Sequence, residues 1–338
     1  MKTHRKGGSL CWLAGWALVA FAAEPVRVAG ADRLIGIQSA RVLSQSMPWI
    51  AQEAGLFQKN ELDLQLVYIA SSGMATAALL GGDAEIALTG GVGLVRAFVQ
   101  GARDLVFIAG VKNVMTQSIL ARPVIKRAED LKGKRIGVSR IGSNTHYFTV
   151  QALRRSGLDP SRDIIFIQTG GEFETLAALA TGSIDAGTMT APGDAKAIAQ
   201  GFHYVVYGPD LRIPYAATVF ATRRPVIEKR LRVVGQFMRA MAEAAKILHT
   251  EREFTYKVLA RHLRVDDRKV LDAAYNSEIK ALEQRLEIKP EALEATLEEV
   301  SQVDPRAKKF KPQDLVDRRF LDELEKSGFF DALWAGKR

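Results

Sequence analysis

The stretch LDLQLVYIASSGMATAALLGGDAEIALTGG, residues 62–91, contains two complete strand-to-helix junctions and indicates the fold class. Apolar and polar residues alternate over 62–68, as in a half-buried strand, and the apolar run 86–88 indicates a second strand. Between them a Ser-Gly pair opens a helix predicted over 74–80, and a Gly-Gly pair ends it. A strand, a helix and a strand in this order predict a parallel α/β sheet with helices on both faces.

The same alternation continues on both sides of this stretch, in two α/β units that lie before and after Pro123. The first unit has further predicted strands at 34–37 and 105–109 and helices at 48–54 and 92–100. The second has predicted strands at 135–138, 164–167, 184–189 and 204–207 and helices at 145–156, 174–180 and 192–200. The chain from 225 to 338 is rich in Glu, Lys, Arg, Leu and Ala and is predicted to be almost wholly helical.

The N-terminus has the three parts of a secretory signal peptide. Lys2, Arg5 and Lys6 form a positive region, residues 10–23 are apolar, and Ala-Phe-Ala at 20–22 ends the run. The run is shorter than the roughly 20 residues that span a bilayer, so we predict a cleaved signal peptide over 1–23. An uncleaved anchor is the alternative. Cleavage removes Cys11, the only cysteine of the chain, and the exported protein then needs no disulfide.

Charge and motifs exclude several classes of function. The formal net charge is +9, but no dense Arg/Lys run indicates nucleic-acid binding. No pair of the five histidines has zinc-ligand spacing, and Walker A and Gly-x-Ser-x-Gly motifs are absent from the sequence. The carboxylates of Glu53, Glu172 and Glu174 are interpreted as solvated charges on helix faces. We therefore expect a protein without enzyme activity, cofactor or metal.

Small hydroxyl residues and glycines gather where predicted strands end and helices begin. A helix N-terminus exposes free N–H groups and a partial positive charge, and such junctions lie at the carboxyl ends of parallel strands, where open α/β sheets bind ligands. Ordinary N-capping is the alternative for any single junction. Together the junctions predict a shared cleft formed by Ser39, Arg41, Ser44, Ser71, Ser72, Gly73, Thr89, Gly90, Gly142, Ser143, Asn144 and Thr145.

Five segments resemble one known family. They are IAQEAGLF (50–57), LLGGDAEIA (79–87), DLKGKRIGV (130–138), GSNTHY (142–147) and ATGSIDA (180–186). In this order they resemble the nitrate/sulfonate/taurine-type substrate-binding proteins of ABC importers, the SsuA/THI5-like (NMT1-like) family. The resemblance runs from about residue 33 to 250, and its most specific parts are the Leu-Lys-Gly-Lys turn and the Gly-Ser-Asn segment.

The resemblance implies a type 2 periplasmic-binding-protein fold, in which two α/β lobes hold the ligand between them. Lobe one would comprise 24–121 and 213–338, and lobe two 122–212. The crossings between the lobes are placed near 120–123 and 208–215. By analogy with the family, Met189 and Thr190 would face the ligand from lobe two. His146 is either a ligand contact or a packing residue.

The resemblance also implies a function, a location and partners. The protein would be a monomeric periplasmic receptor that passes a small solute to an ABC permease in the inner membrane, with its ATPase. The solute would carry an anionic group, such as a sulfonate, held at the helix start near Ser143, with Arg41 or Arg140 neutralising the remaining charge. Two alternatives stay open: an enzyme on this fold acting on a small pyrimidine or aromatic acid, and a periplasmic sensor.

Overall fold

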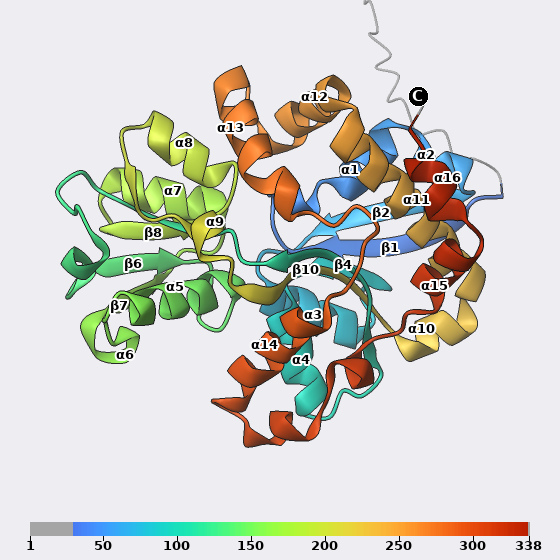
Figure 1. The fold of residues 1–338 in the computed structure, drawn as a ribbon, viewed down its shortest axis with the longest axis horizontal. Coiled ribbons are helices and arrows are strands. Elements are labelled where there is room, and N and C mark those ends of the chain that lie inside the picture. Colours follow the sequence, from blue (N-terminus) through green and yellow to red (C-terminus); the bar gives the residue numbers. More distant parts are fainter. Residues whose placement is uncertain (1–29, 337–338) are drawn as a thin grey trace, which may run out of the picture.

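The computed structural model describes residues 30–336, and its strands form two five-stranded sheets (Figure 1). The expected α/β architecture is confirmed, because each sheet has four strands that run parallel to one another, and most of these are followed by helices. Most predicted elements lie within about two residues of their expected bounds, since hydrophobic alternation and glycine stops are local signals. The strand expected at 105–109 is longer and extends to Val114. The predicted signal peptide and Cys11 lie outside the described residues.

The first sheet has the strand order β2-β1-β3-β10-β4, and β10 runs antiparallel to both of its neighbours. We call this sheet and its helices lobe one. Its strands are β1 (Asp32–Gln38), β2 (Leu62–Tyr68), β3 (Ile86–Thr89), β4 (Leu105–Val114) and β10 (Pro214–Arg223). The helices between them are α1 (Met47–Glu53), α2 (Leu56–Lys59), α3 (Ser72–Gly81) and α4 (Gly91–Val99), with a 3-10 turn at Leu43–Gln45 before α1.

The second sheet has the strand order β7-β6-β8-β5-β9 and forms lobe two with its helices. Its strands are β5 (Ser118–Ala121), β6 (Arg135–Val138), β7 (Ile165–Gln168), β8 (Ala186–Met189) and β9 (His203–Val206). Its helices are α5 (Asn144–Arg155), α6 (Pro160–Asp163), α7 (Glu172–Thr181), α8 (Gly193–Ala199) and α9 (Gly208–Leu211). In both lobes the antiparallel strand, β10 or β5, therefore lies between parallel neighbours.

The chain passes between the sheets at two places, which differ in part from the expected ones. The first passage lies between β4 and β5, so residues 120 and 121 of the expected crossing already belong to the second sheet. The second passage follows α9 and leads directly into β10 at Pro214, which was expected only as a crossing. Both strands are almost completely buried, and without polar alternation the sequence showed no pattern that assigned them to a sheet.

The region after β10 is helical, as expected. It contains α10 (Arg224–Lys229), α11 (Leu231–Thr250), α12 (Arg252–Leu263), α13 (Arg268–Glu278), α14 (Pro290–Ser301), α15 (Arg319–Lys326) and α16 (Phe329–Trp334). Helix α11 packs on α1, and α14 packs on β10 and α4, so these helices complete lobe one (Figure 1). Helix α13 instead contacts α8 of lobe two and the 3-10 turn before α1. None of the helices within residues 30–336 is long and apolar enough to cross a membrane.

Candidate functional site

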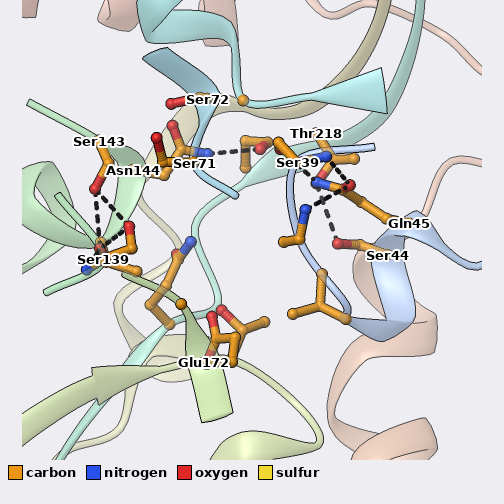
Figure 2. A pocket seen from close by; sticks show the side chains of 18 of the residues that line it. Ser39, Ser44, Gln45, Ser71, Ser72, Ser139, Ser143, Asn144, Glu172 and Thr218 are labelled. Carbon is orange, nitrogen blue, oxygen red and sulfur yellow. Dashed lines mark hydrogen bonds between the residues drawn. The ribbon is translucent and has the colours of Figure 1, made fainter. Parts of the chain in front are cut away.

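A small cavity lies between the two lobes, where the carboxyl ends of strands meet the N-termini of helices (Figure 2). Its volume is about 70 Å³, far below the roughly 300–1,000 Å³ of sites for drug-sized ligands. The strand-to-helix junctions of both lobes supply its walls, as the sequence predicted for open α/β sheets. The predicted residues that line it are Ser39, Ser44, Ser71, Ser72, Gly90, Ser143, Asn144, Thr145 and Thr190.

Four helices begin at the cavity wall. Helices α3 and α4 of lobe one start at Ser72 and at Gly91, directly after the lining residue Gly90. Helices α5 and α7 of lobe two start at Asn144 and Glu172. Each start presents free N–H groups and a partial positive charge. The backbone alone therefore makes the cavity favourable for groups that accept hydrogen bonds.

Three hydroxyl groups form a triangle at the start of α5. Ser139 Oγ lies 2.9 Å from Ser143 Oγ and 2.9 Å from Thr145 Oγ1, and the last two atoms are 3.0 Å apart. The Ser139 N–H also donates to Thr145 Oγ1 at 2.9 Å, which fixes that hydroxyl. Three hydroxyls share three protons, so a rearrangement of their hydrogen bonds can turn one donor toward a solute. Ser139 was not among the predicted site residues, because it lies just before the predicted junction.

The first junction of lobe one is held by Gln45, which belongs to the predicted junction at 44–46 but was not among the predicted ligand contacts. Its Oε1 accepts from the N–H groups of Ser39 and Ala40 at 2.9 and 3.0 Å, and its Nε2 donates to Ser39 Oγ at 3.0 Å. Nearby, Thr218 of β10 donates to Ser44 Oγ at 3.1 Å. These bonds fix the backbone of the turn and both serine hydroxyls at the cavity wall.

Four buried polar atoms of lining residues have no hydrogen-bond partner among the described residues. Two are the hydroxyls of Ser71 and Ser72, which can donate or accept. The other two are the amide oxygens of Gln117 and Asn144, which can only accept. Because buried polar groups are nearly always paired, this set is complementary to a solute that both accepts and donates hydrogen bonds.

The lobes touch each other around the cavity. Asn144 Nδ2 donates to the carbonyl oxygen of Ala217 at 2.7 Å. Arg96 Nη1 donates to the carbonyl of Gly142 at 3.1 Å, and the Leu43 N–H donates to the carbonyl of Ala191 at 3.3 Å. These three hydrogen bonds hold the lobes together beside the cavity.

The interpretation of Glu172 as a solvated charge on a helix face is wrong. Glu172 lines the cavity and is half-buried, whereas Glu174, two residues later, is exposed as expected. Burial raises the pKa of Glu172 to about 8, and the neighbouring Asp194 adds to the rise. The sequence held one signal of this position, because the Thr-Gly-Gly of 89–91, where α4 begins, is repeated at 169–171, directly before α7. That repeated junction was overlooked.

Two arginines that were expected near the anionic group do not line the cavity. The guanidinium of Arg41 lies over the ring of Tyr68 at 4.7 Å, and only the tyrosine reaches the cavity. Arg140 is exposed. The cation that does line the cavity is Lys112, which the sequence analysis did not consider and whose side chain is only 1% exposed.

The remaining predicted residues point elsewhere. Thr89 and Met189 are fully buried in the interior of their lobes, because strands β3 and β8 are covered on both faces. Gly73 lies one residue into α3 and does not reach the wall. Gly142 adopts φ +81° and faces Arg96 rather than the cavity. His146 packs against Phe166 with a centroid distance of 4.7 Å and is not among the residues that line the cavity.

The residues that line the cavity are mainly serine, threonine and amide side chains, with Lys112 and Glu172 as the charged ones. Within residues 30–336 no group of three or more His, Cys, Asp or Glu side chains could hold a metal ion. Neither histidine nor cysteine is present among the residues that line the cavity.

Comparisons with known proteins agree with this architecture. The model of the family described as NMT1/THI5 like matches residues 46–253. The taurine-binding periplasmic protein of Escherichia coli (strain K12) is 27% identical over 240 residues, which are 69% of each chain.

Two solved structures show how widely this fold is used. The alkanesulfonate-binding protein SsuA from Xanthomonas axonopodis pv. citri, bound to MOPS, has a TM-score of 0.71 at 21% identity and covers 88% of this chain and 100% of its own. The desulfurization enzyme DszB has a TM-score of 0.68 at 16% identity and covers 88% of this chain and 99% of its own. The expected periplasmic-binding-protein fold is thereby confirmed, and the same fold also carries an enzyme.

Proposed function

Because the chain belongs to the NMT1/THI5-like family of substrate-binding proteins, we propose that it binds a small organic solute between its lobes and delivers that solute to an ABC importer. The observation that carries this proposal is the cavity, in which helix starts from both lobes meet hydroxyl and amide groups without protein partners. Such a site offers hydrogen bonds from two bodies to one solute, so the solute stabilises the contact between them.

The solute carries a strongly accepting group, of which a sulfonate is the leading example. This group lies at the start of α5, where backbone N–H groups and the hydroxyls of Ser139 and Ser143 supply donors. Neither Arg41 nor Arg140 neutralises it, in contrast to the expectation from the sequence. Helix dipoles from both lobes act in place of a fixed guanidinium.

The site of action follows from the N-terminal sequence and the relative. Two observations support a periplasmic location: the signal-peptide pattern over 1–23 and the similarity to the E. coli protein, which is described as periplasmic. The partner of this chain is then an ABC permease of the inner membrane, driven by the ATPase of the importer. The protein acts as a monomer and needs no cofactor.

A thermal-shift screen tests this function. The solutes are taurine, alkanesulfonates, nitrate, bicarbonate, aromatic acids and pyrimidines. A solute present at about 100 times its dissociation constant adds roughly 2.7 kcal/mol to the free energy of unfolding and raises the melting temperature. A solute that is recovered unchanged supports a receptor, whereas a solute that is converted supports an enzyme on this fold. If no solute in the screen shifts the transition, the proposed solute-binding function is wrong.

A further inference from the structure

The buried region beside the cavity contains more carboxylates than cations. Lys112 is its one ammonium group among the described residues, and it is paired with Glu278 at 2.9 Å. Two further carboxyl groups, those of Glu172 and Asp194, form no ion pair with any Lys, Arg or His that the structure describes. If both ionise, the region has an excess of negative charge without a compensating cation.

The two unpaired carboxyl groups have different surroundings. Asp194 is only 4% exposed and does not line the cavity, and it accepts hydrogen bonds from the Ala195 N–H at 2.7 Å and from Tyr204 OH at 3.1 Å. Glu172 accepts from the Thr190 N–H at 2.9 Å through Oε2, and its carboxylate points into the cavity (Figure 2). Glu172 is therefore the carboxylate that a solute can reach.

A second side chain, Gln117, also presents an unpaired hydrogen-bond acceptor to the cavity. Gln117 is 5% exposed and lines the cavity, and its Oε1 has no donor among the described residues. An amide oxygen can only accept a hydrogen bond, so its partner has to be an N–H or O–H group. Glu172 and Gln117 can therefore accept hydrogen bonds from a donor on the solute. The starts of α3 and α5 instead favour an acceptor on the solute.

We propose that the solute is a zwitterion with a primary ammonium group, and that Glu172 selects for this group. The inference rests on the proposed function and specifies its substrate class. The ammonium group donates to the ionised Glu172, and the accepting group lies at the start of α5. No bond is made or broken, and the solute brings the cation that the protein does not supply.

The energetics favour this arrangement over a solute with an apolar end. A buried carboxylate without a cation keeps its proton, which agrees with the pKa of Glu172 at about 8. An ammonium group in contact allows Glu172 to ionise, and hydrogen bonds between two charged groups are the strong ones. A methyl group at the same place provides neither charge nor a donor, so it leaves Glu172 and Gln117 without partners.

Calorimetric titration with matched pairs of solutes tests the inference. Taurine and propane-1-sulfonate differ by an ammonium group against a methyl group, and β-alanine and butyrate form the same pair for carboxylates. In the wild-type protein we expect the amine to bind about tenfold or more tightly than its methyl counterpart in the pair that binds. Glu172→Gln should bring the two affinities close together, mainly by weakening the amine. The matched control is Glu174→Gln, because that side chain is exposed on the same helix.

The possible results distinguish a failure of the ammonium inference from a failure of the proposed solute-binding function. Equal affinities within a pair in the wild-type protein overturn the inference without relying on any variant, and the solute-binding function stands. The same holds if only solutes without an amine bind, or if Glu172→Gln melts normally and keeps the full preference. If no solute of the wider screen binds, the proposed function itself fails.

Discussion

Lys112 Nζ lies 2.9 Å from Glu278 Oε2, although 166 residues separate the two in the chain. Both side chains are 1% exposed, and Thr116 accepts from Lys112 at 2.6 Å and donates to Glu278. Lys112 belongs to β4 just before the passage to lobe two, and Glu278 ends α13, which contacts both lobes. The pair thus fastens the C-terminal helices to the chain segment that connects the lobes.

Removing one member of this pair should destabilise the protein strongly. We expect Glu278→Leu to lower the free energy of unfolding by about 3–5 kcal/mol, because it leaves the Lys112 ammonium buried without its partner. The double variant with Lys112→Met should recover much of this loss, since no buried charge remains. Urea denaturation measures both values. The control is Glu253→Gln, which breaks the exposed pair with Arg268 and should change little.

Gly90 of lobe one lies against the side chain of Asn144 of lobe two. A Cβ atom there would lie 2.4 Å from the side-chain amide of Asn144, the residue that bonds lobe two to Ala217. We expect Gly90→Ala to hold the lobes apart, so that solute binding weakens and small-angle scattering shows a larger radius of gyration with solute present. Gly73→Ala is the control, because nothing lies within 4 Å of its added Cβ. Wild-type closure in Gly90→Ala would show that Asn144 can move aside without cost.

Ser143→Ala should weaken solute binding while leaving the free protein nearly as stable as before. The variant removes one hydroxyl of the triangle, and a hydrogen bond to a charged group is worth roughly 1.5–3 kcal/mol, which corresponds to about tenfold or more in affinity. Titration calorimetry gives the affinity and thermal melting gives the stability. Ser183→Ala removes an exposed hydroxyl far from the cavity and should leave both unchanged. Unchanged affinity in Ser143→Ala would mean that the triangle only caps α5.

Gly142→Val should also weaken binding, but for another reason than Ser143→Ala. Gly142 has φ +81°, and an added Cβ would lie 2.3 Å from Arg96 Nη1. The variant therefore strains the turn and displaces the hydrogen bond from Arg96, which joins the lobes. Unlike Ser143→Ala, it should lower the melting temperature without solute. A normal melting temperature with weak binding would instead place the side chain in the path of the solute.

The stability of the solute-free protein should fall with rising pH because of Glu172. Its pKa is 4.5 when unfolded and about 8 when folded, so between these values the folded state holds a proton that the unfolded state has lost. The free energy of unfolding then decreases as the pH rises from 4.5 to 8. Asp194, with a pKa of about 6, contributes in the same direction over a lower range.

Glu172→Gln isolates this effect. The variant should lose less stability between pH 5 and pH 8 than the wild-type protein, measured by urea denaturation at both values. The charged and titratable groups that face Glu172 remain in place, namely Asp194, Lys112, Glu278 and Tyr68. Parallel pH profiles for the two proteins would show that Glu172 is already ionised near neutrality.

Local sequence patterns were sufficient for most of the architecture. The alternation over 62–68, the glycine pair at 81–82 and the hydroxyl-rich starts of α3 and α5 act through neighbours a few residues away. The parallel α/β arrangement, and the collection of Ser71, Ser72, Ser143 and Thr145 at one edge, follow from such signals because strand ends meet at one side of a sheet.

Contacts between residues far apart in the chain determine the features that local sequence patterns did not predict. Strands β5 and β10 are buried by elements from remote parts of the chain, so their own residues carried no alternation. Glu172 resembles a solvated helix charge in the sequence, but the fold places it at the cavity, where Thr190 donates to it and burial raises its pKa. Lys112 meets Glu278 only because the C-terminal helices return to the passage between the lobes. Charge state depends on solvent access and on neighbours in space, and both arise only when the chain has folded.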